Sequence, residues 1–263
     1  MRVMTFNLRF ENNDDGPNAW SNRKDKVIKL IRHYAPSILG TQEGKINQLK
    51  YLDDNLPEYH GNLSDRIQDK TAQYPTLFFR KKDFEIIQEK EFWLSKTPDV
   101  FQSKSWDSAF PRMLSCIKAT FLENGKPVWA GVTHLDHKGK EARNQQAKIV
   151  AEWFNKKKED LILMGDFNDS PASTVHKTLT APKTDLYDTW GILGYKEDQE
   201  NFTYHGFEGV PKKSRMDWIL VSSGFDVINA FIIKDKFNGS YPSDHFPYMA
   251  DLACISHRHV FVR

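Results

Sequence analysis

Apolar and polar positions along the chain predict a few amphipathic helices among many short strands. Val27, Leu30, Ile31 and Tyr34 recur at helical spacing, so a helix is expected from about residue 23 until Pro36 ends it. The same periodicity predicts helices over 46–56 and 139–158. A short helix is expected within 171–179, with Pro171 in its first turn.

Short apolar runs predict strands through the rest of the chain. The Asn124-Gly125 pair predicts a hairpin between two of them. Because hairpins are about as common as helical crossovers, a purely parallel sheet is disfavoured. The pattern instead indicates an α/β protein with mixed sheets, two of them packed face to face between helices. The expected strands are 1–8, 37–43, 75–81, 84–94, 113–122, 127–135, 161–166, 216–222, 226–233 and 248–255.

Composition changes this picture little. The chain has 263 residues, 39% hydrophobic and 27% charged, and it contains no long repeat and no Pro/Gly/Ser-rich linker, so one domain over 1–263 is expected. The formal net charge of +2 neither favours nor excludes nucleic acid. Two cysteines in apolar settings indicate free thiols. Since no run approaches a membrane span and the N-terminus does not read as a signal peptide, a cytoplasmic location is expected.

Polar residues stand at or near the ends of several predicted strands, where one alone would be an ordinary loop residue or cap. Burial of unpaired carboxylates is costly, so a whole set of them points to a shared cleft if the strands are neighbours. The set comprises Asn7, Glu43, His134, Asp166, Asn168, Asp217, Asp244 and His245.

The segment LILMGDFNDSP shows what such a cleft could do. In extended chain, Asp166 and Asn168 would face one cavity while Phe167 turns into the core. The carboxylate can orient or deprotonate a water, and the amide can donate to a developing anion. Oxygen ligands such as Glu43 and Asn7 suit Mg²⁺ or Mn²⁺, whereas two distant cysteines argue against a thiolate zinc site. Together these groups indicate metal-assisted phosphoryl chemistry.

Six motifs in this order resemble the endonuclease/exonuclease/phosphatase superfamily, whose members include deoxyribonuclease I, repair nucleases, deadenylases, inositol-polyphosphate phosphatases and neutral sphingomyelinases. They are MTFNLR, TQEGK, VTHLDH, LMGDFNDSP, RMDWILVS and SDHFPY. The resemblance spans Asn7 to His245. Within this range the loop GPNAWSNR is similar to one in small bacterial members. It implies a four-layer α/β sandwich with two mixed, mostly antiparallel sheets between helical layers. It also implies a metal-dependent hydrolase acting on phosphoester bonds.

The resemblance also implies roles for the individual residues. Glu43 resembles the primary metal ligand, Asn7 its neighbour, and Asp244 a carboxylate close to the metal. Asp166 resembles the residue that handles the attacking water. The remaining residues resemble a donor to the scissile phosphate (Asn168), a phosphate-contacting histidine (His245) with its orienting carboxylate (Asp217), and a second such histidine (His134). The identity of the general base and the number of metals stay open.

Three further residues are weaker candidates for substrate binding. Arg112 precedes a strand as a phosphate-contacting arginine does in some relatives, or it forms a surface ion pair. Trp20 contributes either to a substrate rim or to the core. Arg143 reaches a substrate charge or, as we favour, a structural salt bridge.

The substrate depends on loops that one sequence describes poorly. The near-neutral charge favours a small or lipid-like phosphate ester over duplex DNA. Alternatives are a DNA or RNA nuclease and a catalytically silent binding module on the same fold. Lys212, Lys213 and Arg215 form a local basic patch in the sequence, and the nearby aromatics, including Tyr204, either pack or stack a ligand. A monomer is favoured, with the oligomeric state open.

Overall fold

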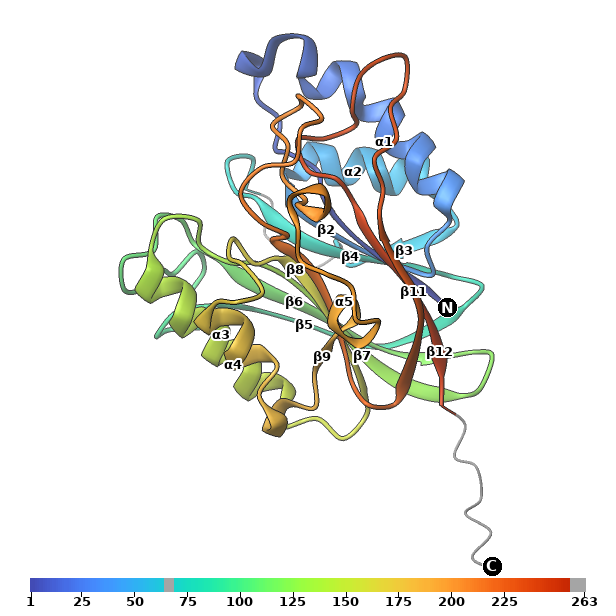
Figure 1. Ribbon diagram of the computed structural model, residues 1–263, viewed down its shortest axis with the longest axis vertical. Coiled ribbons are helices and arrows are strands. Elements are labelled where there is room, and N and C mark those ends of the chain that lie inside the picture. The colour runs from blue at the N-terminus through green and yellow to red at the C-terminus, as the bar shows by residue number, and fades with distance from the viewer. Residues whose placement is uncertain (64–68, 256–263) are drawn as a thin grey trace, which may run out of the picture.

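Two six-stranded β-sheets form the centre of the computed structural model, which describes residues 1–63 and 69–255 (Figure 1). Residues 64–68 and 256–263 of the expected domain lie outside the described residues. The first sheet runs in the order β11-β12-β1-β2-β4-β3. Its strands are Arg2–Asn7 (β1), Ile38–Gly44 (β2), Tyr59–Gly61 (β3), Tyr74–Arg80 (β4), Phe225–Ile232 (β11) and Tyr248–Cys254 (β12).

The second sheet has the order β5-β6-β7-β8-β10-β9. Each sheet contains one parallel pair, β1 with β2 and β7 with β8, while the other neighbours are antiparallel. The strands of this sheet are Phe84–Trp93 (β5), Met113–Phe121 (β6), Lys126–His134 (β7), Asp160–Asp166 (β8), Tyr187–Asp188 (β9) and Asp217–Val221 (β10).

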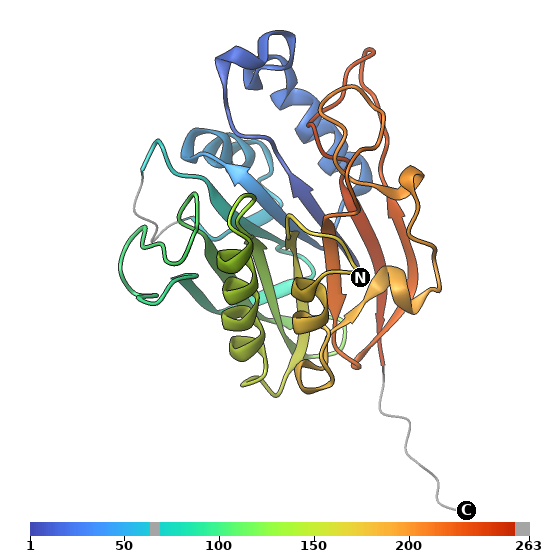
Figure 2. The same ribbon diagram turned by 60° about the vertical axis from the view of Figure 1, so that its left-hand side comes forward.

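Helices cover the outer faces of both sheets. α1 (Trp20–Tyr34) and α2 (Ile46–Asn55) pack on the first sheet through a cluster that includes Met4, Phe6 and Leu49. On the second sheet, α3 (Lys140–Phe154) and α4 (Thr174–Leu179) lie side by side and share a cluster with Phe167 (Figure 2). The expected four-layer sandwich of two mixed sheets between helices is therefore confirmed.

A third cluster fills the space between the sheets. Alternate residues of β1 and β8, such as Val3 and Met164, point into it. At Gly40 of β2 the sheets come so close that an added Cβ would lie 2.5 Å from Met164 Sδ. Glycine at this position therefore allows the close approach of the two sheets.

The predicted elements are confirmed with shifted ends. The first helix begins at Trp20, three residues before its expected start, and α4 is capped by Ser173 rather than started by Pro171. The hairpin at Asn124-Gly125 joins β6 to β7, with Gly125 at φ 69°. Not predicted were the short elements β3, β9 and α5 (Thr189–Ile192), and the 3₁₀ turns Asn13–Asn18, Pro182–Thr184 and Gln199–Asn201.

Both cysteines are free thiols, as the sequence indicated, with Cys116 buried and Cys254 half-buried. In the described part of the chain, no helix has the length and apolar character needed to cross a bilayer.

Candidate active site

The two parallel strand pairs bring the predicted polar residues to one end of the sandwich. Asn7 ends β1, and Glu43 lies one residue before the end of β2. In the other sheet His134 ends β7 beside Asp166 of β8, its register partner. Asp217 starts the antiparallel β10 opposite Asp166. Residues from both sheets therefore meet where these strands end.

Asp166 occupies the centre of this group. Its Oδ2 accepts a hydrogen bond of 3.0 Å from Asn7 Nδ2 across the gap between the sheets, and its Oδ1 accepts one of 2.9 Å from the Asn168 backbone N–H. Burial, followed by the nearby charge of Asp217, raises the pKa of Asp166 to about 7. A carboxyl with such a pKa is suited to exchange a proton near neutral pH.

His245 and Asp217 form a buried pair. His245 Nδ1 donates to Asp217 Oδ2 at 2.9 Å, and His245 Nε2 lies 3.8 Å from Asp166 Oδ2. Burial by itself would lower the pKa of His245, but the surrounding carboxylates, Asp217 first, raise it to about 10. The imidazole is therefore held protonated and oriented, with Nε2 directed at Asp166. The Tyr204 ring packs edge-on against the imidazole at 5.2 Å between centroids.

Asn168 and His134 form a second pair. The Asn168 Nδ2 lies 2.8 Å from His134 Nε2 and donates to the Leu135 carbonyl oxygen at 3.0 Å. Burial and the Arg112 cation lower the pKa of His134 well below its usual value, so the ring is neutral and its Nε2 accepts. Both N–H bonds of the Asn168 amide are thus used within the protein, and donation to a phosphate requires that one of them be exchanged.

Glu43 and Asp244 face the same cavity from the first sheet and the loop before β12. Glu43 has a left-handed backbone, φ 62°, and its Oε2 accepts a hydrogen bond from the Phe10 N–H at 3.0 Å. Asp244 is buried beside His245, and this burial raises the pKa of its carboxyl. Two carboxylates with few hydrogen-bond donors around them leave lone pairs for a cation.

The donor set fits a hard divalent cation. Ligand atoms of Asp166, Asp217 and His245 all lie within 4.8 Å of one another, and Asp217 Oδ1 is buried with no hydrogen-bond partner. This group differs from the set Glu43, Asn7 and Asp244 that the sequence predicts. His245 Nδ1 already binds Asp217, whereas Glu43, Asn7 and Asp244 offer only oxygen atoms as ligands, the ligand type that a hard cation prefers.

Of the polar residues predicted at strand ends, all but Asn7 and Asp217 line a cavity of about 400 Å³, which we call the active-site cavity; they are Glu43, His134, Asp166, Asn168, Asp244 and His245. Its volume is within the range of about 300–1,000 Å³ that is usual for small-molecule sites. Within the described residues, two arginines and two lysines line it: Arg9, Arg112, Lys138 and Lys213. They provide positive charge around an acidic floor, the distribution needed to bind a phosphate group over a metal.

The three weaker candidates take different places. Arg112 lines the active-site cavity, is only 7% exposed, and its Nη2 lies 3.3 Å from His137 Nδ1. Trp20 is buried in the cluster under α1. Arg143 donates to Asp169 and to the Asp136 carbonyl oxygen. Neither Trp20 nor Arg143 is among the described residues that line the cavity, and their substrate-binding roles stay predictions.

Some residues of the cavity, such as Arg9, received no role from the sequence, whereas Tyr204 and Lys213 were named only among the aromatics and in the basic patch. Arg9 follows the MTFNL strand, and Tyr204 comes from the long polar segment. Lys213 lies 4.1 Å from the Tyr204 ring centroid. The proposed basic patch was wrong for Arg215, which is fully buried and paired with Asp188 and Glu197. Sequence spacing alone gives no signal that separates Arg215 from Lys212, which is half-buried, and Lys213, which is exposed.

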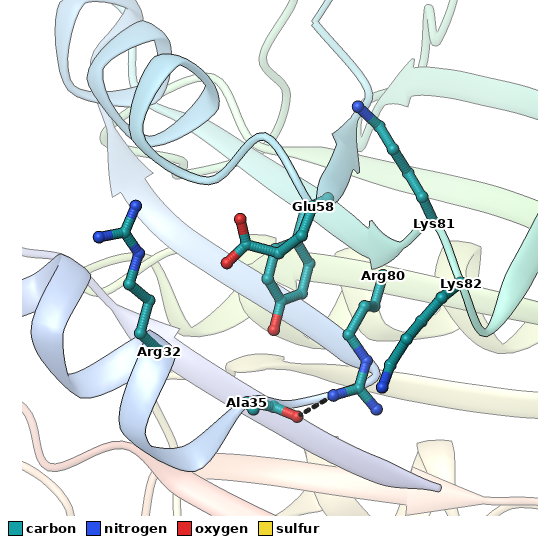
Figure 3. A pocket seen from close by; sticks show the side chains of 7 residues that line it. Arg32, Ala35, Glu58, Arg80, Lys81 and Lys82 are labelled. Atoms are coloured by element: carbon teal, nitrogen blue, oxygen red, sulfur yellow. Dashed lines mark hydrogen bonds between the residues drawn. The ribbon is translucent and has the colours of Figure 1, made fainter.

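A second basic concavity of about 400 Å³ lies at the opposite end of β2 (Figure 3). Arg80 donates to the Ala35 carbonyl oxygen and to Asp83, and Lys81 donates to the Pro57 carbonyl oxygen. Arg32 likewise donates to a carbonyl, that of Asn55. These cations stabilise the segments that follow α1 and α2 and the turn after β4. Glu58 is the one carboxylate that lines the concavity within the described chain. We therefore place the chemistry at the other end.

The fold is that of a family of phosphoester hydrolases. The chain belongs to the Endonuclease/Exonuclease/phosphatase family, whose pattern it matches over residues 4–245. This confirms the family resemblance seen in the sequence. Members of the family are phosphoester hydrolases that generally use divalent metals. A comparison with curated proteins gave no match.

Two solved structures from Bacteroides are similar along nearly the whole chain. The mannosyl-6-phosphatase of Bacteroides thetaiotaomicron VPI-5482 is 29% identical, with a TM-score of 0.88, covering 96% of this chain and 99% of its own. A family member from Bacteroides vulgatus is 30% identical, with a TM-score of 0.87, covering 97% and 98%. The human nocturnin catalytic domain shares the fold, with 23% identity, a TM-score of 0.74 and coverage of 97% and 93%.

Proposed function

We propose that this chain is a Mg²⁺- or Mn²⁺-dependent phosphoesterase that hydrolyses the phosphate ester of a small organic molecule. The observation that carries the proposal is the convergence of a central carboxyl, a protonated histidine and two further carboxylates on one cavity with four cations around it. Glu43, with Asn7 and Asp244, would hold the cation, which supplies charge neutralisation at the phosphate.

Other residues would act on the attacking water and on the phosphate. Asp166, with a pKa raised to about 7, accepts the proton of the attacking water, and Asn7 fixes its orientation through Oδ2. His245, protonated and held by Asp217, donates to a phosphate oxygen. The neutral His134 and the Asn168 amide form the opposite wall, where an exchanged N–H contacts the phosphate.

A sugar phosphate is the first substrate to test, because a mannosyl-6-phosphatase is among the similar structures. The formal net charge of +2 and a cavity of about 400 Å³ also suit a small ester better than a duplex. Nucleic acids and lipid phosphates are tested beside it as alternative substrates.

The test is a substrate panel assayed with Mg²⁺, Mn²⁺ or EDTA. It contains mannose 6-phosphate, methyl phosphate, bis-p-nitrophenyl phosphate, plasmid, single-stranded RNA and vesicles with phosphoinositide or sphingomyelin. We expect phosphate release from the small monoesters, its loss in EDTA, and a loss of about 10²-fold or more in Glu43→Gln. Glu58→Gln, at the opposite end of β2, is the matched control.

Three results would overturn the proposal. Faster cleavage of plasmid or RNA than of any small ester would make the chain a nuclease. Turnover that persists in EDTA and in Glu43→Gln would remove the metal from the chemistry. A chain inactive on the whole panel, with melting temperature unchanged by Mg²⁺, would be a silent binding module.

A further inference from the structure

A smaller cavity of about 280 Å³ opens beside the active-site cavity, and we call it the side cavity. The two cavities share Gln73, Phe110 and Arg112. The remaining lining residues of the side cavity are Thr71, Ala72, Trp93, Gln102 and Pro111. A group bound in it would therefore lie next to whatever the active-site cavity holds.

We propose that the side cavity holds the uncharged, hydroxyl-bearing ring of the phosphate ester, with the phosphate on the other side of Arg112. This inference rests on the proposed function and assigns residues to substrate choice. Its first support is the position of Arg112. The guanidinium is 7% exposed, and its Nε is buried without a hydrogen-bond partner, while Asp136 lies 3.8 Å away. Arg112 can therefore serve a phosphate at the boundary between the cavities.

The chemistry of the lining is the second support. Trp93 and Phe110 supply aromatic surface, and Gln73, Gln102 and Thr71 supply amide and hydroxyl groups. Among the described residues that line the side cavity, Arg112 is the only charged one. Apolar faces with a few placed polar groups are typical of sites for small neutral rings. A nucleic acid would place further phosphates here, and Arg112 is the one cation that the described lining offers them.

The two aromatic rings are held in position before any ligand binds. Phe110 is 54% exposed yet stacks on His137 at 5.6 Å and 20°. Trp93 is 8% exposed and packs edge-on against Phe101 at 5.6 Å and 89°. Fixed aromatic surface binds a ring at little cost in side-chain entropy.

The amides of the side cavity have unused hydrogen-bonding capacity. Gln73 is half-buried and makes no hydrogen bond within the described residues. Gln102 Nε2 donates to Asp69 Oδ2 at 2.6 Å, which leaves its carbonyl oxygen as an acceptor. Together they offer donors and acceptors of the kind that sugar hydroxyls require.

The test compares two probes that differ by the ring. Mannose 6-phosphate and methyl phosphate are assayed with wild type, Phe110→Ala and Gln73→Ala, and the readout is the ratio of kcat/KM for the two esters. We expect the ratio to fall about tenfold or more in Phe110→Ala and several-fold in Gln73→Ala. Tyr187→Ala, an aromatic 46% exposed on β9, should leave the ratio unchanged. Phe110 is exposed enough for its variant to fold, which melting curves check.

The outcomes separate the two hypotheses. A ratio unchanged in Phe110→Ala and Gln73→Ala overturns the side-cavity proposal while phosphoesterase activity stands. If the wild type hydrolyses neither probe, the proposed function fails, and calorimetric binding of mannose 6-phosphate decides the side cavity. Binding weakened by Phe110→Ala supports the proposal, and no binding or unchanged binding overturns it.

Discussion

Gly165→Ala tests whether the close packing of β7 against β8 sets the position of the central carboxyl. Gly165 precedes Asp166 and pairs with Thr133 of β7. A Cβ there would lie 2.1 Å from the Thr133 carbonyl oxygen, where real Cβ atoms keep about 3.0 Å. Because the obstacle is backbone rather than a flexible side chain, β8 must move by roughly 1 Å.

The expected magnitudes follow from this displacement. The backbone at Gly165 has φ 156°, which side chains rarely adopt. Strain and overpacking together should cost about 3 kcal/mol of unfolding free energy. For a chain of this size, that lowers Tm by about 6–12 °C. A 1 Å shift of Asp166 should also lower kcat by about 10²-fold in the folded variant.

The assay uses thermal unfolding followed by circular dichroism, and steady-state kinetics at least 15 °C below the Tm of the variant. Gly191→Ala is the matched control, because its Cβ would meet nothing closer than Asp188 Cβ at 3.9 Å. Wild-type Tm and kcat in Gly165→Ala would refute the reasoning. So would equal losses in both alanine variants.

Two more predictions concern buried pairs. Asp188 binds Arg215 at 2.6 Å. Burial raises the pKa of the Asp188 carboxyl, but the Arg215 cation lowers it, and the net pKa lies below the usual value. The ionised Asp188 carboxylate stabilises the folded state at pH values above its unfolded pKa of about 3.9. This stabilisation is lost as the pH falls through the lower pKa of the folded state. Asp188→Asn should thus lower Tm at pH 7, and the gap to wild type should narrow as pH falls below about 3.9, so a gap that does not narrow would contradict the pairing. Asp217→Asn should reduce kcat by about 10²–10⁴-fold with KM changed only a few-fold. Asp226→Asn on β11 is its control, and equal kinetics in the two variants would exclude an orienting role for Asp217.

The strand and helix pattern was readable from the sequence because each element carries its own periodicity. Residues of β8 alternate between the two clusters on either side of the sheet, and α1 shows one apolar face. The short strands β3 and β9 were not predicted, because two or three residues show no period. The order of strands depends on contacts far apart in the sequence, which periodicity does not record.

The candidate site was also partly readable. The polar residues at strand ends do meet, because both parallel pairs place their ends at one edge. The sequence did not show which hydrogen-bond and ion-pair partners each group has. The chain position of Asn168 gives no sign that its amide nitrogen is occupied by His134 and Leu135. Likewise, the buried Arg215 forms salt bridges with Asp188 and Glu197, which lie 27 and 18 residues away from it in the sequence.

The two halves of the site belong to different sheets. Glu43 and Asn7 extend from the first, and Asp166, His134 and Asp217 from the second. Core side chains between the sheets, the Asn7–Asp166 bond and the His245–Asp217 bond fix the spacing of these groups. The volume of residues such as Met164, packed against Gly40, therefore helps to set the distance between the proposed cation ligands and the proposed proton acceptor. Substitutions in the interior should therefore alter the proposed catalysis without exchanging any residue that lines the active-site cavity.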